Sequence, residues 1–149
     1  GDYGSVNKLD YTCIGDAVNL AARLESANKV FGTWIMVSGQ TRDLAGEEFE
    51  FRSLGRLQVA GKQQAVRVYE LLARRGQVDD ARRRYAELFA LAVGLFQDRR
   101  WDDAAEAFAV CRQERSDDPG VELYLDHVQR YRDRPPPDGW NRGIELTTK

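Results

Sequence analysis

Asn19 and Arg23 are the residues whose types and spacing point most directly to chemistry. They lie in the stretch YTCIGDAVNLAARLE, residues 11–25, four positions apart. On a helix the two side chains would share one face, because residues i and i+4 are about one turn apart. An amide beside a fixed positive charge suits a sugar hydroxyl and a phosphate better than a protein core. The alternative interpretation is a solvated helix face.

The residues around this pair predict a strand followed by a helix. Residues 9–14 are apolar and rich in β-formers, and Asp16 suits the N-cap of a helix. Apolar side chains then recur at helical spacing, at Val18, Leu20, Ala21, Leu24 and Ala27. The helix would therefore carry Asn19 and Arg23 directly after a strand and a Gly-Asp turn.

Residues 33–72 predict further mixed structure. We expect a strand, a short helix, a second strand, a tight turn and a return strand, over residues 33–37, 38–44, 48–60, 61–64 and 66–72. The last two strands would form an antiparallel hairpin, with a bend in the first of them near Gly55.

Three helices should follow a polar boundary at residues 74–80. We expect them over 80–97, from 101 to about 116, and from 119 to about 132. Asp118 as N-cap and Pro119 at the first helical position mark the third start, and the prolines at 135–137 stop that helix. The predicted inward side chains are Tyr85, Leu88, Phe89, Ala92, Leu95, Phe96, Ala104, Ala105, Phe108 and Cys111. His127 is expected at the surface, and residues 138–149 as irregular chain or a short strand.

Composition limits the classes of function. The 149 residues are 42% hydrophobic with a formal net charge of −2, so there is no bulk argument for nucleic acid as a partner. Two cysteines without a C-x-x-C spacing predict reduced thiols, and a single histidine argues against a His-based metal site or triad. Neither a membrane-spanning apolar run nor a signal peptide is visible.

Three motifs, in order, resemble the class III nucleotidyl cyclases. Residues 9–25, LDYTCIGDAVNLAARLE, resemble the signature near the end of that catalytic domain. The preceding GDYGS, residues 1–5, resembles its Gly-x-x-Gly-Ser turn. Residues 54–71, LGRLQVAGKQQAVRVYEL, resemble its closing hairpin. The resemblance covers residues 1 to about 72, about half of the chain.

The resemblance implies cyclisation of a nucleoside triphosphate, with attack of the 3′-hydroxyl on the α-phosphorus and loss of pyrophosphate. In the family, the Asn matching Asn19 orients the ribose, and the Arg matching Arg23 neutralises transition-state charge. The residue matching Thr12 contacts the base. Thr is typical there of many bacterial adenylate cyclases, whereas guanylate cyclases have Cys. Cys13, the next residue, would face the opposite way on a strand, so ATP is the expected substrate.

The closing hairpin differs from the family at one position. Two Lys usually flank a Gly there and bind the terminal phosphates, but here the first is Ala60 and only Lys62 is present. Lys62 is therefore the candidate phosphate ligand, with a plain turn residue as the alternative. Ala60 favours a different class of function, a cyclase-like domain that binds nucleotide or dimerises without catalysis. A guanylate cyclase is the other alternative.

The resemblance also implies what lies outside this sequence. The Mg²⁺ or Mn²⁺ ligands of the family, two Asp, precede its matching motifs, so no metal ligand is expected in this chain and the fragment alone should be inactive. Catalysis would need a homodimer, in which one subunit supplies the metal site and the other supplies Asn19 and Arg23. We expect a cytoplasmic catalytic portion, with a membrane anchor as one option upstream.

The predicted fold class is α+β: the C-terminal portion of a ferredoxin-like class III cyclase domain, followed by an all-α helical tail. The expected domains are the cyclase part over 1–74, the helical tail over 75–134, and a Pro-rich stop with an irregular end over 135–149. The helix pair at 82–116 resembles one tetratricopeptide unit, so the tail is a candidate docking surface for another protein. A single unit is short of a stable array, so we expect the tail to pack on the first part or on a second copy.

Overall fold

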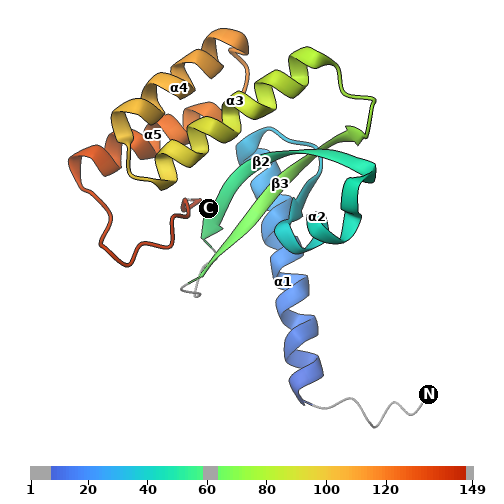
Figure 1. The fold of residues 1–149 in the computed structure, drawn as a ribbon. Coiled ribbons are helices and arrows are strands. Elements are labelled where there is room, and N and C mark those ends of the chain that lie inside the picture. The colour runs from blue at the N-terminus through green and yellow to red at the C-terminus, as the bar shows by residue number, and fades with distance from the viewer. Residues whose placement is uncertain (1–7, 59–63, 147–149) are drawn as a thin grey trace.

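A small antiparallel sheet with helices beside it forms the described part of the chain. This computed structural model describes the backbone of residues 8–58 and 64–146, and side chains from residue 17 onward. In chain order the elements are α1 (Lys8–Phe31), β1 (Met36–Ser38), α2 (Gly39–Ala45), the 3-10 helix η2 (Gly46–Glu48), β2 (Phe49–Gln58), β3 (Ala65–Arg74), α3 (Asp80–Gln97), α4 (Trp101–Glu114) and α5 (Pro119–Asp133). The strand order is β1-β3-β2, and both pairs are antiparallel (Figure 1). The α+β prediction is confirmed.

The β2–β3 hairpin matches the prediction. Its register runs from Phe49 opposite Arg74 to Gln58 opposite Ala65. A register shift falls just before Gly55, whose φ of +93° is a backbone conformation that glycine adopts without a steric penalty. The predicted bend near Gly55 is therefore confirmed. The predicted turn between the strands lies mostly outside the described residues.

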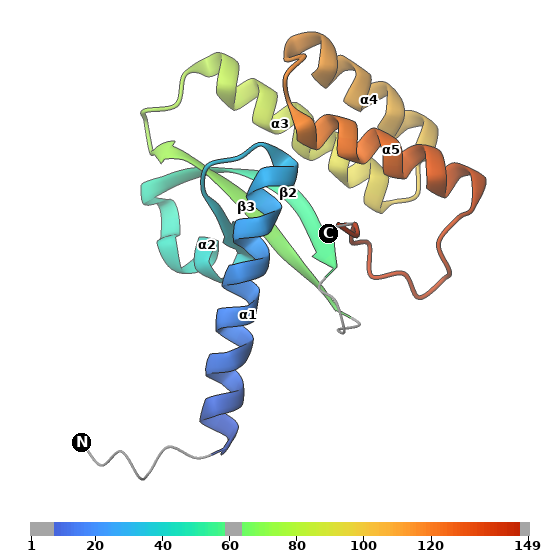
Figure 2. The ribbon, with the colours of Figure 1, turned by 180° about the vertical axis from the view of Figure 1, so that it is seen from behind.

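The strand predicted over residues 9–14 is wrong, because this segment belongs to α1, which begins at Lys8. Asp16 is consequently inside the helix and is not its N-cap. A strand satisfies its backbone groups only beside another strand, and the described residues place none there, whereas a helix bonds its own backbone. The N-terminal half of α1 extends away from the sheet (Figures 1 and 2).

β1 begins later than predicted because Thr33, the first residue of its expected range, is hydrogen-bonded back to the end of α1. The Thr33 amide donates to the Asn28 carbonyl at 3.0 Å, and the Thr33 hydroxyl donates to Asn28 Oδ1 at 2.6 Å. Pairing with β3 starts only where the Leu71 amide donates to the Ile35 carbonyl at 3.0 Å. The short helix predicted next is confirmed as α2, with Ser38 as its N-cap.

The three helices of the second half begin where the sequence predicted. Asp79 caps α3 by accepting from the Arg82 amide at 2.7 Å, and Asp118 caps α5 by accepting from the Gly120 amide at 3.1 Å. The predicted inward faces of α3 and α4 are largely buried; the fully covered members are Tyr85, Phe89, Ala92, Phe96, Ala104, Phe108 and Cys111. No helix in the described residues is long and apolar enough to cross a membrane.

The helices of the second half pack on the sheet and share its hydrophobic core. α3 lies along β2, and α1 crosses one face of the sheet and also reaches α5 (Figure 2). One cluster of buried side chains joins α1, the sheet and α3–α5; its largest members are Phe31, Leu54, Leu57, Phe89, Phe96, Phe108, Tyr124 and Ile144. The tail therefore packs on the first part of the same chain, one of the two expected arrangements.

The chain after α5 returns to the sheet. Ile144 forms a parallel bridge with Leu57: its amide donates to the Arg56 carbonyl, and its carbonyl accepts from the Gln58 amide, both at 2.9 Å. Ile144 is completely buried, and Trp140 lies in a ring cluster with Phe96. Residues 138–146, the C-terminal segment, thus meet the edge of β2 at its C-terminal end, from Arg56 to Gln58.

His127 is 1% exposed, so its predicted surface position is wrong. It lies on the inward face of α5 with Tyr124 and Val128, at the three- and four-residue spacing that defines a buried stripe. Its Nδ1 is 2.9 Å from the Leu123 carbonyl, and its ring meets Tyr131 edge-on. Residue type alone predicts solvent exposure for a histidine, whereas its position in an apolar stripe places it inside.

Candidate functional site

Asn19 and Arg23 lie on the middle of α1, where the helix emerges from the core. Asn19 is exposed and Arg23 is half-buried. The buried side chains of α1, Leu24, Ala27 and Phe31, all follow them toward its C-terminal end. The one-turn spacing puts the amide and the guanidinium on the same face, as the sequence predicted. The exposed Asn19 amide can hydrogen-bond a ligand outside the core, and Arg23 places a positive charge one helical turn away.

Thr12 and Lys62 cannot be placed relative to this pair. Thr12 is in the N-terminal half of α1, and its side chain lies outside the described residues. Successive residues face opposite ways on a strand but not on a helix, so the predicted opposite orientation of Thr12 and Cys13 does not apply in α1. Lys62 lies in the connection between β2 and β3, outside the described residues. The base and phosphate contacts proposed for these two residues stay predictions.

A buried charged network joins the sheet to the helices, and sequence reasoning missed it. Arg52 on β2 is 3% exposed, and it donates to Glu70 Oε1 at 2.9 Å and to Asp118 Oδ2 at 2.5 Å. The Tyr85 hydroxyl donates to the same Asp118 oxygen at 2.6 Å. The Arg52 guanidinium also lies 4.6 Å from the Phe89 ring centroid. Only the N-cap role of Asp118 was visible in the sequence, because its partners lie 33 and 66 positions away.

The pKa shifts in this network follow from burial and paired charges. Burial alone would lower the pKa of Arg52, but the carboxylates of Asp118 and Glu70 outweigh it and raise that pKa. Burial, then the bond to Asp118, raises the pKa of Tyr85. Burial also raises the pKa of the Cys111 thiol to about 11. Cys111 is therefore protonated at neutral pH and unsuited to nucleophilic chemistry.

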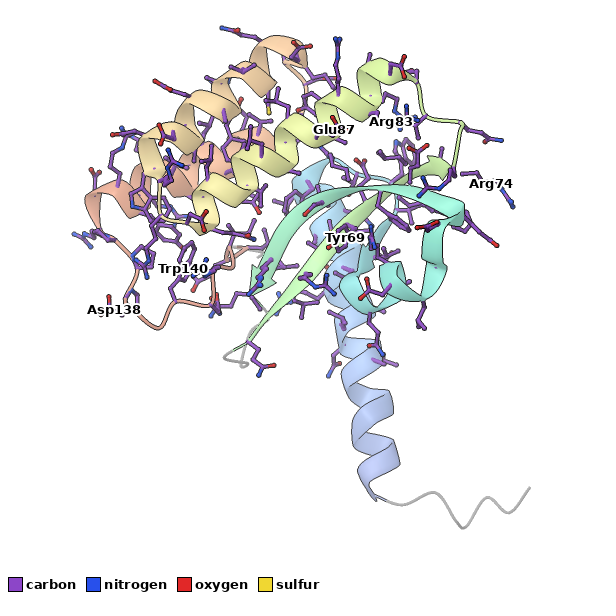
Figure 3. The ribbon with its side chains drawn as sticks, viewed as in Figure 1. Tyr69, Arg74, Arg83, Glu87, Asp138 and Trp140 are labelled. Carbon is purple, nitrogen blue, oxygen red and sulfur yellow. The ribbon has the colours of Figure 1, made fainter. Side chains whose placement is uncertain are left out.

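An open groove of about 370 Å³ lies between α3 and one sheet face. Figure 3 shows Tyr69 on the sheet and Arg83 and Glu87 on α3. Arg83 Nε lies 3.0 Å from Glu50 Oε1, and this hydrogen bond lowers the pKa of Glu50. The Arg42 guanidinium sits 5.5 Å from the Tyr69 ring centroid. The charged residues that line the groove are Arg42, Arg75, Arg83, Glu50 and Glu87.

No metal centre is assembled by the residues that the structure describes. Their His, Cys, Asp and Glu side chains form no group of three or more that could hold an ion. These residues therefore do not fit the divalent ions that a cyclase mechanism implies.

Three curated proteins resemble the chain. Adenylate cyclase 1 of Rhizobium meliloti (strain 1021) is 38% identical over 72 residues, covering 48% of this chain and 11% of that protein. An adenylate cyclase of Anabaena cylindrica is 37% identical over 76 residues, covering 49% and 15%. The terminal-differentiation specific adenylate cyclase of Dictyostelium discoideum is 28% identical over 131 residues, covering 84% and 6%. No family model and no solved structure matches.

The Dictyostelium match extends beyond the sheet. Because it covers 84% of the 149 residues, the matched region includes α3 and α4 wherever it starts. The chain spans only 6–15% of the length of these three relatives. Together the matches support a relationship to cyclases for a chain that places an exposed amide and a guanidinium on one helix face.

Proposed function

We propose that this chain is the C-terminal part of the catalytic domain of a class III adenylate cyclase, with a helical extension. The observation that carries the proposal is the similarity to three proteins named adenylate cyclase, for a chain with an exposed Asn19 one helical turn from a half-buried Arg23. The complete enzyme would convert ATP to 3′,5′-cyclic AMP and pyrophosphate.

Each candidate residue has a distinct role in this reaction. The ribose 3′-oxygen forms a bond to the α-phosphorus as it loses its proton, and the bond from that phosphorus to pyrophosphate breaks. Asn19 orients the ribose, and Arg23 stabilises the negative charge that develops on the phosphate. Thr12 would contact the base and Lys62 the terminal phosphates. We assign the divalent ions to residues outside this chain, so the isolated chain should be inactive.

The proposed assembly is a homodimer whose active sites combine two subunits. One subunit would provide the metal ligands and the other Asn19 and Arg23. In this scheme residues 1–74 are the catalytic part of the ferredoxin-like domain, 75–134 the tetratricopeptide-like extension and 135–149 the C-terminal end. The extension also remains a candidate docking surface for another protein.

A non-catalytic nucleotide-binding or dimerisation module is the alternative that a specific residue favours. Ala60 replaces the first of the two hairpin lysines, which weakens the expected grip on the terminal phosphates. The preserved Asn19 and Arg23 oppose this alternative. A guanylate cyclase is disfavoured by Thr12.

A chimera tests the proposal. The whole chain is fused behind the upstream catalytic half of the Rhizobium meliloti enzyme, and cyclic AMP formation from ATP is measured with Mn²⁺. Arg23→Ala should lower kcat about 100-fold, the usual effect of losing one transition-state charge contact. Lys29→Ala is the matched control, since it removes an exposed cation from the same helix.

Each result of the chimera assay has one meaning. An active chimera that loses its rate with Arg23→Ala, but not with Lys29→Ala, supports the cyclase assignment. A folded, silent chimera that Ala60→Lys revives shows a lost phosphate contact. Silence in all variants, with folding confirmed by circular dichroism, would favour the non-catalytic module. Cyclic GMP from GTP at a higher rate would favour the guanylate cyclase.

A further inference from the structure

Residues 118–120, which we call the corner, lie where three separate elements meet the start of α5. Asp118 binds Arg52 of β2 and Tyr85 of α3 through one carboxylate oxygen. Asp118, Gly120 and the residue after it, Val121, are buried. The third element at the corner is the C-terminal end of α1, the helix that carries Asn19 and Arg23.

The C-terminal end of α1 packs closely against the corner. A Cβ added to Gly32 would lie 2.8 Å from the ring carbons Cγ and Cδ of Pro119. A Cβ added to Gly120 would lie 3.2 Å from Phe31 Cδ1 and 3.5 Å from Phe89 Cζ. Two glycines thus let the backbones of α1 and α5 approach closely. The position of the corner therefore fixes the position of the C-terminal end of α1.

Buried charges hold the corner in one place. The side chains of Arg52 and Asp118 are 4% and 2% exposed, and their pair is 2.5 Å apart. Glu70 shares the guanidinium at 2.9 Å. Moving the corner away from β2 would leave a buried charge without its partner, which is a large cost. The helical extension is therefore joined to the sheet at a defined distance.

A small movement at the corner would be amplified along α1. At 1.5 Å per residue, Arg23 and Asn19 lie about 12 and 18 Å from Phe31 on one continuous helix. A tilt of about 5° at Phe31 would shift Asn19 by roughly 1.5 Å. A misplacement of about 1 Å in a reacting complex can cost up to 100-fold in rate.

We infer that the corner positions α1 for the proposed reaction, and that Asp118 and Arg52 are positioning residues for Asn19 and Arg23. The inference rests on the proposed function for its catalytic consequence. The helical extension is then part of the machinery that aligns the substrate-facing helix. The inclusion of α3 and α4 in the Dictyostelium match agrees with a joint unit.

Asp118→Asn is the variant that tests this. Asn is as good an N-cap as Asp, so α5 keeps its start while the buried ion pair with Arg52 is lost. Glu122→Gln is the matched control, because it removes an exposed ion pair with Arg112 from the same helix. In the active chimera, Asp118→Asn should lower kcat about tenfold and leave KM for ATP within about twofold. Glu122→Gln should change neither constant.

Hydrogen exchange on the unfused chain provides the second readout. Asp118→Asn should raise the exchange rate of the α1 amides from residue 24 to 31 at least tenfold, while the β3 amides change less than twofold. Unchanged α1 amides would overturn the inference, and so would equal acceleration in every element, which indicates general destabilisation. A kcat unchanged by Asp118→Asn in an active chimera would also overturn it. An inactive parent chimera would count against the proposed function, and exchange would still decide whether the corner holds α1.

Discussion

Gly55 shows how one residue can be required for two reasons. Its φ is +93°, and the Tyr124 hydroxyl occupies the space where a Cβ would be, donating to the neighbouring Leu54 carbonyl at 2.5 Å. Gly55→Ala should therefore lower the free energy of unfolding by about 3 kcal/mol, combining backbone strain with overpacking. Urea denaturation measures it.

Gly76→Ala is the matched control for that substitution. Gly76 has a φ of +84°, but no atom lies within 4 Å of the position of its Cβ. The expected cost is only the backbone term, about 1 kcal/mol. Equal losses in the two variants would show that the Tyr124 contact does not constrain Gly55.

His127 should make stability decrease as pH falls below about 6.5. Burial lowers the pKa of His127 from the ordinary 6.5, and the nearby Arg130 lowers it further. Hydrogen bonds to the backbone of Leu123 and Glu145, and the charge of Asp126, raise that pKa but do not outweigh the burial. The folded chain thus keeps His127 neutral while the unfolded chain takes up a proton as pH falls below 6.5. Stability is full above that pH and decreases as pH falls toward the folded pKa.

The test compares the unfolding midpoint in urea at pH 7 and pH 5 for the native chain and His127→Phe. The urea midpoint of the variant should fall much less between pH 7 and pH 5 than that of the native chain, because phenylalanine fills the site without titrating. Glu50 and Glu122, whose pKa values are lowered, affect stability mainly below about pH 4.5. Identical decreases in both proteins would rule out His127 as the titrating group.

At the scale of elements, the C-terminal segment is joined to β2 by one isolated bridge, between Ile144 and Leu57. Ile144→Ala should cost about 2–4 kcal/mol, since this fully buried side chain would leave a cavity. It should also speed exchange of the Gln58 amide, whose acceptor is the Ile144 carbonyl. Urea denaturation and hydrogen exchange measure the two effects.

Ile35→Ala provides the comparison for Ile144→Ala. The same side chain is 51% exposed at Ile35, so its loss should cost less than about 1 kcal/mol. It should also leave exchange at Gln58 unchanged. If exchange of the Gln58 amide stayed slow in Ile144→Ala, the hydrogen bond between the C-terminal segment and β2 would not depend on the Ile144 side chain.

At the scale of the whole molecule, the shared core predicts a single cooperative unfolding transition. Of the three tryptophans, Trp34 is 94% exposed near β1, whereas Trp101 and Trp140 lie among the rings of the helical part. In a Trp34→Phe variant, fluorescence would therefore report the helical part. Far-UV circular dichroism would report the whole chain. The two midpoints should coincide. Separate midpoints would support residues 1–74 and 75–134 as independently folding domains.

Local sequence signals determined much of the fold. The hairpin, the cap at Asp118 and the inward faces of α3 and α4 were all predictable. Each depends on neighbours within a few positions, through backbone geometry, capping hydrogen bonds or helical periodicity. The spacing that places Asn19 and Arg23 on one helix face belongs to the same class of signal.

Only the tertiary structure decided which residues meet across the chain. Residues 9–14 have strand composition, but a strand requires a neighbour, and without one in the described structure the segment joins α1. Arg52 and His127 look like surface residues, yet both are buried. The partner of Arg52 at Asp118 lies 66 positions away along the chain. The sequence alone determined the groups available for chemistry. Long-range packing at the corner decided what holds the helix that carries them.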